Sequence, residues 1–75
     1  MFKEHLATII SRTDLNQSQM SEMMAEIFDG KTTDAQVGAM MAALATKGET
    51  FEELAGAARA MRKKAHRIQA AVMPV

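Results

Sequence analysis

Histidines and their neighbours are the first residues of this 75-residue chain in which chemistry would be sought. The chain has two, His5 and His66, and neither has a second ligand at a metal-binding spacing. Lys63, Lys64 and Arg67 surround His66 in sequence, and their positive charges oppose a bound cation. We expect both histidines to be solvated, and we predict no metal site.

The carboxylates and glycines also have structural explanations. Glu52 and Glu53 fall at a predicted helix N-terminus, where negative charge is favourable, and Glu22 and Glu26 are four residues apart on a polar helix face. The glycines at positions 30, 38, 48 and 56 never cluster in a loop before a helix, so no phosphate-binding loop is present. With no cysteine there is neither a disulfide nor a thiolate metal site. The sequence therefore predicts no catalytic, cofactor-binding or metal-binding residue in this chain.

Start and stop signals divide the chain into four helices. The first is predicted from about residue 2 to residue 11, and the last from residue 51 to residue 66 or beyond. Three capping boxes mark the helix starts that follow the first one: Asn16 with Gln19, Thr33 with Gln36, and Thr50 with Glu53. Gly30 and Gly48 are predicted to end the second and third helices. Because no strand pattern interrupts these segments, we predict an all-α fold, a compact bundle of four short helices.

Apolar and small side chains indicate how the helices pack. Phe2, Leu6, Ile9 and Ile10 form a stripe on the first helix. The second carries a ridge of Met20, Met23, Met24, Ile27 and Phe28. Gly38 and Gly56 each cost about 1 kcal/mol relative to Ala inside a helix, so we expect a helix crossing or a subunit contact to pass over them. The candidate helix-packing or dimer contacts are Met40, Met41, Leu44, Leu54, Gly56 and Met61.

Charge limits the classes of partner. Formal net charge is zero, but all nine acidic residues lie at or before Glu53, whereas the following segment is basic. Cations near a helix C-terminus complement its dipole, and the chain lacks Tyr and Trp, so we predict no nucleic-acid partner. Met1-Phe2-Lys3-Glu4-His5 has no secretion-signal pattern and no long apolar run follows, so no membrane contact and a cytoplasmic location are expected.

The order of these motifs resembles the N-terminal helical domain of the anthranilate phosphoribosyltransferases, in the glycosyltransferase family 3 and nucleoside phosphorylase superfamily. The resemblance extends from about Leu6 to His66. The segments that carry it are Met24–Gly30, Thr33–Leu44, Lys47-Gly48-Glu49-Thr50, Glu53–Ala58 and Met61-Arg62.

The resemblance implies that residues 1–67 are a helical N-terminal domain and that residues 68–75 begin a linker to an α/β catalytic domain. The parent enzyme would transfer phosphoribose from phosphoribosyl pyrophosphate to anthranilate in tryptophan biosynthesis, with magnesium. Its catalytic residues would lie beyond Val75, so this chain alone would be inert. The small domain would close one side of the substrate cleft and contribute to a homodimer.

Two alternatives remain open. The chain could be a free-standing helical module whose basic end, Arg59 to Arg67, contacts a protein or a nucleic acid; a helix that begins Phe51-Glu52-Glu53 would repel phosphate and weakens the nucleic-acid version. It could also be a natural truncated paralogue that serves as a dimerisation partner or regulator.

Overall fold

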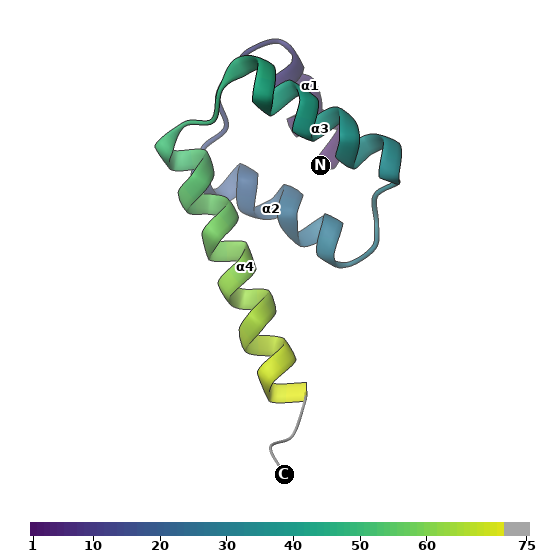
Figure 1. Ribbon diagram of the computed structural model, residues 1–75, viewed down its shortest axis with the longest axis vertical. Helices are drawn as coiled ribbons and strands as arrows, with labels where there is room; N and C mark the ends of the chain where they lie inside the picture. The colour runs from purple at the N-terminus through teal and green to yellow at the C-terminus, as the bar shows by residue number, and fades with distance from the viewer. Residues whose placement is uncertain (72–75) are drawn as a thin grey trace.

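Four α-helices make up the chain in the computed structural model, which describes the backbone of residues 1–71 and the side chains of residues 1–66. They are α1 (Phe2–Ile10), α2 (Gln17–Phe28), α3 (Asp34–Lys47) and α4 (Phe51–Ala71) (Figure 1). No strand occurs in this described part. The predicted all-α fold of four helices is confirmed.

All three predicted capping boxes form. At the start of α2, the Gln19 backbone N–H donates to the Asn16 side chain (2.8 Å), and the Asn16 N–H donates to the Gln19 side chain (3.0 Å). The same reciprocal pair joins Thr33 and Gln36 at the start of α3. Each box satisfies backbone donors that a helix N-terminus otherwise leaves free, so it fixes where the helix begins.

The two glycines that were expected to end helices do so by their backbone conformation. Gly30 has φ +73° just after α2, and Gly48 has φ +89° at the end of α3. Both values lie in the region that glycine occupies without a side-chain penalty. The chain can therefore reverse direction in the short loops that lead to α3 and α4.

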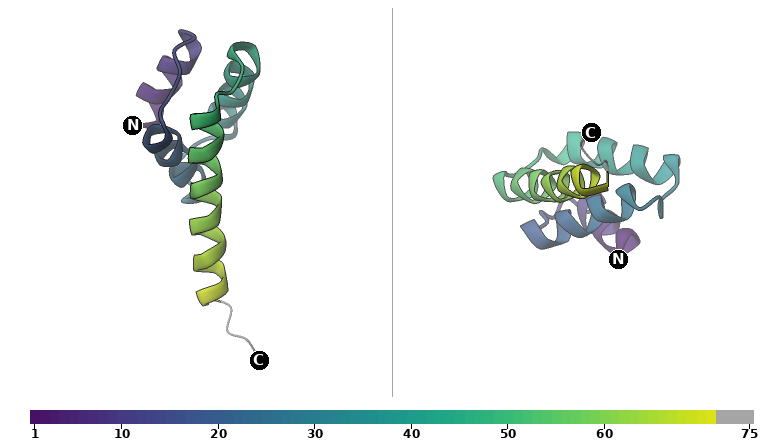
Figure 2. Two further views of the ribbon diagram at one scale, coloured as in Figure 1. Left: turned by 90° about the vertical axis from the view of Figure 1, so that its left-hand side faces the viewer. Right: turned by 90° about the horizontal axis from the view of Figure 1, so that it is seen from below.

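The helices pack as two pairs. The most extensive contact joins α2 to α4, the next joins α1 to α3, and α1 also touches α2. Figure 2 shows α4 running past the ends of the other helices, so its C-terminal part projects from the bundle. The two pairs meet through one core cluster. Its buried members are Phe2, Ile9, Leu15, Met20, Met23 and Met40.

One residue of the predicted apolar stripe on α1 faces outward. Ile9 is buried, whereas Ile10 at the end of the helix is exposed. Ile10 lines an open pocket between the end of α1 and the small residues Ala39 and Ala42 of α3, which leave most of its side chain in contact with solvent. The prediction that Ile10 joins the buried stripe is therefore wrong.

The two glycines inside helices differ in their surroundings. A Cβ atom at Gly56 on α4 would lie 3.0 Å from the Cα atom of Gln17 and would also meet the carbonyl oxygen of Gln17. Gly56 therefore lets α4 approach the first residue of α2 closely. A Cβ atom at Gly38 on α3 would meet nothing within 4 Å, so the described chain supplies no crossing there.

Helix α4 continues through Ala71, past residue 67, where the sequence was expected to leave the domain. Residues 68–71 include two alanines and no helix breaker, so nothing in the local sequence ends the helix there. The rest of the expected linker, residues 72–75, lies outside the described residues. No helix in the described part is long and apolar enough to span a membrane.

Candidate functional site

The six residues proposed as packing or dimer contacts divide into an inward and an outward group. Met40 belongs to the buried core, Leu44 packs partly buried against it, and Gly56 is buried against α2. The outward group is Met41, Leu54 and Met61, with exposed fractions of 66%, 57% and 55%. The first three residues hold the helices together, whereas the other three are available to another surface.

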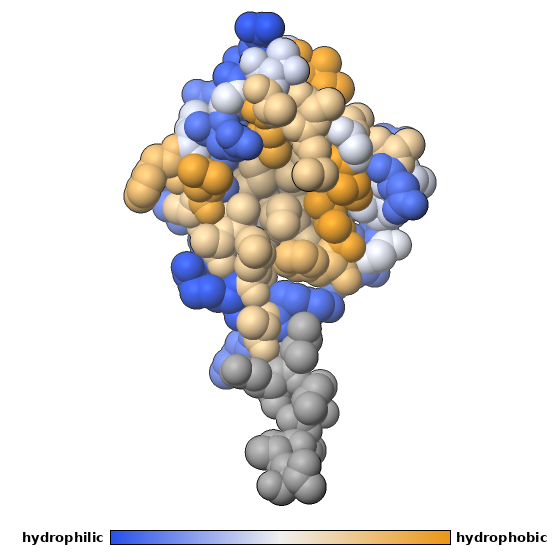
Figure 3. All heavy atoms as spheres, viewed as in Figure 1, coloured by the Kyte–Doolittle hydropathy of each residue, from blue (hydrophilic) through white to orange (hydrophobic). Residues whose placement is uncertain are grey.

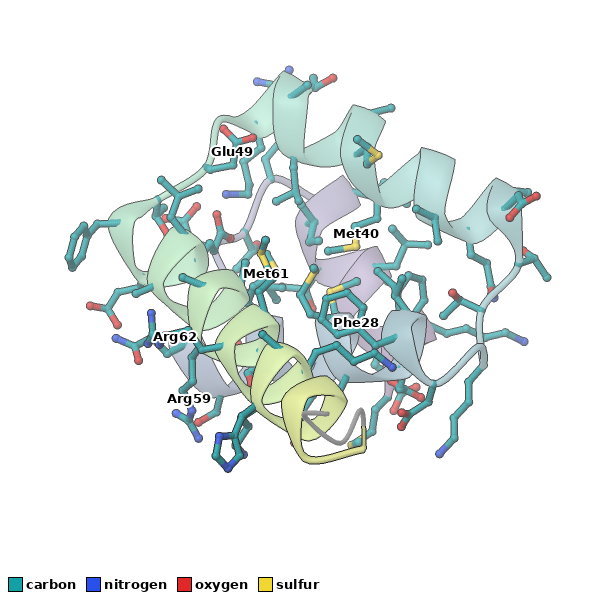
Figure 4. The ribbon with its side chains drawn as sticks, turned by 60° about the horizontal axis from the view of Figure 1, so that its bottom comes forward. Phe28, Met40, Glu49, Arg59, Met61 and Arg62 are labelled. Carbon is teal, nitrogen blue, oxygen red and sulfur yellow. The ribbon has the colours of Figure 1, made fainter. Side chains whose placement is uncertain are left out.

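The outward group belongs to an apolar face spread over α3 and α4. Figure 3 shows this face covered mostly by apolar residues. Met61 lies on the flank of α4 that faces α3 (Figure 4), and Leu54, seven residues earlier, lies on the same flank. Helix α3 carries small or apolar residues on its exposed side as well as on its buried side, and a helix of this kind is normally covered on both sides. On α3 the exposed small or apolar residues are Ala35, Gly38, Ala39, Met41, Ala42 and Ala45.

A buried ion pair sets the geometry between α3 and α4. The Lys47 ammonium at the end of α3 donates to Glu53 Oε1 (2.8 Å), Asp14 Oδ1 (2.9 Å) and the Gly48 carbonyl oxygen (2.8 Å). Its side chain is 4% exposed, and the Glu53 carboxylate in the first turn of α4 is fully buried. The ion pair therefore ties the two ends of the α3–α4 loop to each other and to the loop before α2.

The Glu53 carboxylate also accepts hydrogen bonds from two backbone N–H groups. Oε2 accepts from Leu15 (2.7 Å), and Oε1 accepts from Thr50 (2.9 Å), which completes the third capping box because the Glu53 N–H donates to the Thr50 hydroxyl (3.1 Å). A buried carboxylate is tolerated only when its oxygens are satisfied in this way. We name Asp14, Leu15, Lys47, Thr50 and Glu53 the junction cluster.

Opposing effects decide the charge states of Glu53 and Lys47. Burial alone raises the pKa of Glu53, but the hydrogen bonds from Leu15, Lys47 and Thr50 and the charge of Lys47 outweigh it, so the pKa lies below 4.5. Burial alone lowers the pKa of Lys47, but hydrogen bonds to Glu53 and Asp14 and their charges outweigh it, so the pKa lies above 10.5. Both groups are therefore charged at neutral pH.

Sequence reasoning missed most of the junction cluster. The capping box of Thr50 and Glu53 was recognised, but Glu53 was explained as a helix-dipole residue. Leu15, which donates to Glu53, precedes it by 38 positions, and Asp14, which accepts from Lys47, precedes that lysine by 33 positions, so no local pattern could have connected them. The available signal was Lys47, which ends α3 six residues before the carboxylate and lies next to a tight turn at Gly48.

The two histidines have different environments. His66 is exposed, as expected for a solvated residue. His5 is 13% exposed, and its Nε2 lies 2.8 Å from Glu22 Oε1 on α2. The prediction that His5 is solvated is therefore wrong, because α1 packs against α2 and brings the ring to a carboxylate.

An open groove of about 730 Å³ lies between α2 and α4. Its α2 side carries Ser21, Ala25, Phe28 and Asp29. The α4 side carries Ala60 and the basic residues Arg59, Arg62, Lys63 and His66. Figure 4 shows Arg59 and Arg62 on one flank of α4, away from the flank that carries Met61. The groove and the apolar face therefore use different flanks of α4.

The described residues differ in how far they are open to other molecules. Among them, no group of three or more His, Cys, Asp or Glu side chains could hold a metal ion. The charged pair of the junction cluster is buried and saturated with internal partners, so it has no free position for a substrate. The apolar face and the groove are accessible to other molecules.

Known proteins match nearly the whole chain. The model for the glycosyl transferase family, helical bundle domain, matches residues 3–65. The anthranilate phosphoribosyltransferase of Desulfosudis oleivorans is 65% identical over 71 residues, which make up 95% of this chain and 21% of that protein. The enzyme of the same name from Syntrophobacter fumaroxidans is 62% identical over 69 residues, 92% of this chain and 20% of that protein.

The chain therefore spans about a fifth of the length of the curated relatives that it matches. No solved structure matches it. The family model covers most of the chain, and the helices that it describes as a bundle are the four described above. We conclude that this chain belongs to the helical bundle domains of the glycosyl transferase family.

Proposed function

We propose that this chain is the N-terminal helical domain of an anthranilate phosphoribosyltransferase. The observation that carries the proposal is the 65% identity to an enzyme of that name over 95% of this chain. The parent protein would transfer phosphoribose from phosphoribosyl pyrophosphate to the amine of anthranilate in the cytoplasm. Magnesium and the catalytic residues would belong to an α/β domain, and the helical domain alone would be inert.

The contribution of this domain would be mechanical. It would form one wall of the substrate cleft, contact the α/β domain and supply surface for a homodimer. The apolar face over α3 and α4 supports this role, because exposed apolar patches with few charges commonly mark contacts with other protein surfaces. Gly38 supports it too, since a partner helix could approach α3 closely where no side chain intervenes.

The junction cluster would give this wall its stiffness. It connects the end of α3, the start of α4 and the loop before α2 through one buried carboxylate. A cleft wall must keep its shape while the domain moves against its neighbour, since a displacement of about 1 Å can cost roughly a hundredfold in rate. The cluster would therefore act on catalysis only through position.

The test is to sequence the encoding reading frame beyond Val75 and to assay its complete product for anthranilate-dependent release of pyrophosphate from phosphoribosyl pyrophosphate. We expect the complete product to be active and the 75-residue chain to be inactive under the same conditions. A complete product that ignores anthranilate, or a reading frame that stops after Val75, would refute the assignment and favour a helical interaction module.

A further inference from the structure

Four basic side chains on α4 stand without an ion pair among the described residues. All of them line the groove between α2 and α4, and all are exposed: Arg59, Arg62, Lys63 and His66. Asp29 is the one acidic residue that lines the groove in residues 1–66, and it has an interaction of its own. All nine acidic residues of the chain lie at or before Glu53, so the later part of α4 adds no negative charge.

The helix dipole does not account for these basic residues. A helix C-terminus stabilises cations within about its last turn. Helix α4 continues to Ala71, and its last turn contains no basic residue. Arg59 and Arg62 lie roughly two and a half turns or more before that end. Their positive charges therefore remain without a partner inside the described part of the chain.

The groove has an apolar base as well as a basic wall. Ala25 is exposed and Phe28 is half-buried, and both line the groove from α2. Helix α2 is the neighbour that α4 contacts most extensively, and the C-terminal part of α4 projects past the bundle (Figure 2). Apolar atoms beside exposed charges are typical of the contact surface between two domains of one polypeptide.

We propose that this groove is the surface on which the polypeptide beyond Val75 packs, with carboxylates of that polypeptide bound to Arg59 and Arg62. The inference rests on the proposed function, which takes this chain to continue into an α/β domain. The chain spans about a fifth of its relatives' length, so most of the parent protein would lie outside it. Guanidinium groups suit the contact because they bind carboxylates through two parallel hydrogen bonds.

The covalent connection favours this occupant over a separate protein. Helix α4 carries the basic wall and would lead into the rest of the polypeptide, which is thereby held near the groove at a high effective concentration. A second copy of the chain has another surface available, since Arg59 and Arg62 stand on a flank of α4 away from Met61 (Figure 4). The two arginines would thus be positioning residues that fix how α4 meets the α/β domain.

The test is zero-length cross-linking of the complete product of the reading frame. A carbodiimide joins a lysine ammonium to a carboxylate where the two are in direct contact, and Lys63 is an exposed lysine on the groove wall. We expect mass spectrometry to find Lys63 linked to an Asp or Glu beyond residue 75 of the same molecule. Lys3, exposed on α1, is the control and should not link to that part. Mixing isotope-labelled and unlabelled protein separates links within one molecule from links between copies.

Matched variants of the complete product assign the link to the arginines. Arg59→Glu with Arg62→Glu should reduce the yield of the Lys63 link by at least roughly tenfold, because like charges would then face each other. Arg59→Lys with Arg62→Lys keeps the charge and should retain most of the yield. Lys3→Glu with Lys31→Glu makes the same change of charge at exposed positions elsewhere and should leave the yield unchanged. Circular dichroism should be the same for all three variants.

The proposal would be overturned if Lys63 formed no link beyond residue 75, if it linked only to another copy, or if both charge reversals lowered the yield equally. Release of pyrophosphate, measured on the same preparation, separates this inference from the proposed function. An active product without the Lys63 link would refute the groove contact alone. A linked product that ignores anthranilate would support the groove contact and refute the proposed enzyme.

Discussion

At the scale of single residues, the Glu53 side chain connects three parts of the fold. Its two oxygens accept hydrogen bonds from Leu15 before α2, Lys47 at the end of α3 and Thr50 before α4, and the residue is 1% exposed. Removing one partner of a buried ion pair leaves the other charged and unsatisfied, which costs more than the pair itself contributes. Glu52, its neighbour, is exposed in the same helical turn.

We predict that Glu53→Gln lowers the free energy of unfolding by about 3–5 kcal/mol, because the ammonium of Lys47 loses its buried counter-charge. Glu52→Gln is the matched control and should change it by less than about 0.5 kcal/mol. Urea unfolding followed by circular dichroism measures both. Equal effects of the two substitutions would show that the junction cluster is not a main source of stability.

A second residue-scale prediction compares the two glycines inside helices. Gly56→Ala should destabilise the chain by about 1–3 kcal/mol, because the new methyl group meets the backbone of Gln17, which cannot yield as a flexible side chain does. Gly38→Ala meets nothing within 4 Å and should stabilise the isolated chain by about 0.5–1 kcal/mol. The midpoints of thermal unfolding give the signs, and stabilisation by both changes would contradict the close approach at Gly56.

At the scale of helices, the sequence predicted the three capped starts because the signals are local. Capping pairs lie three residues apart, so Asn16 with Gln19 and Thr33 with Gln36 are legible without knowledge of tertiary contacts. The end of α4 was harder to predict from the sequence, since it depends on how far a good helix-forming sequence continues before Pro74. Burial on α1 was also misjudged where the helix ends, at Ile10.

We predict that Thr33→Ala lowers the free energy of unfolding by about 1 kcal/mol, because Gln36 loses the oxygen that accepts its backbone N–H. Thr32→Ala, one position earlier, removes a hydroxyl that caps no helix and should have a smaller effect. Chemical denaturation of both variants tests this. If Thr32→Ala proved the more costly change, the cap assigned to α3 would be wrong.

At the scale of the whole molecule, the charge states of the junction cluster predict how stability depends on pH. The folded-state pKa of Glu53 lies below 4.5. The ionised carboxylate therefore adds to the free energy of unfolding above pH 4.5, and this stabilisation is lost as pH falls through the folded-state pKa. The folded-state pKa of Lys47 lies above 10.5. The charged ammonium therefore adds to the free energy of unfolding below pH 10.5, and this stabilisation is lost as pH rises through the folded-state pKa.

We therefore expect stability to be nearly flat between about pH 5 and 8 and to decrease in acid below about pH 4.5. The Glu53→Gln variant should show a shallower decrease, because the group that must be protonated is gone. Unfolding free energies measured at several pH values provide the comparison. Parallel curves for the two proteins would mean that other carboxylates govern acid unfolding.

The apolar face predicts self-association of the whole chain. Met41→Lys would place an unpaired charge in that contact and should weaken association by at least roughly tenfold, whereas Ala7→Lys adds the same charge to exposed surface on α1 and should not. Sedimentation equilibrium measures both. A wild-type chain that stays monomeric at millimolar concentration would contradict the role proposed for this face.

The sequence was sufficient for the fold class and the helix order, because periodicity and caps are properties of short segments. It could not supply the contacts of Glu53 with Leu15, of Lys47 with Asp14 or of His5 with Glu22, since these residues meet only when segments distant in sequence pack together. The division of Met40 from Met41 likewise depends on which flank of α3 meets α1. Long-range contacts therefore determine which polar side chains pair and which apolar side chains are buried, and periodicity alone does not predict either.

The most direct measurement is the anthranilate-dependent release of pyrophosphate by a chimera in which this chain replaces the matching helical segment of the Desulfosudis oleivorans enzyme. Our account predicts an active chimera, since 65% identity over nearly the whole chain preserves the domain. It also predicts that Glu53→Gln in the chimera reduces activity more than Glu52→Gln does. A folded chimera without activity would contradict the assignment of this chain as the helical domain of such an enzyme.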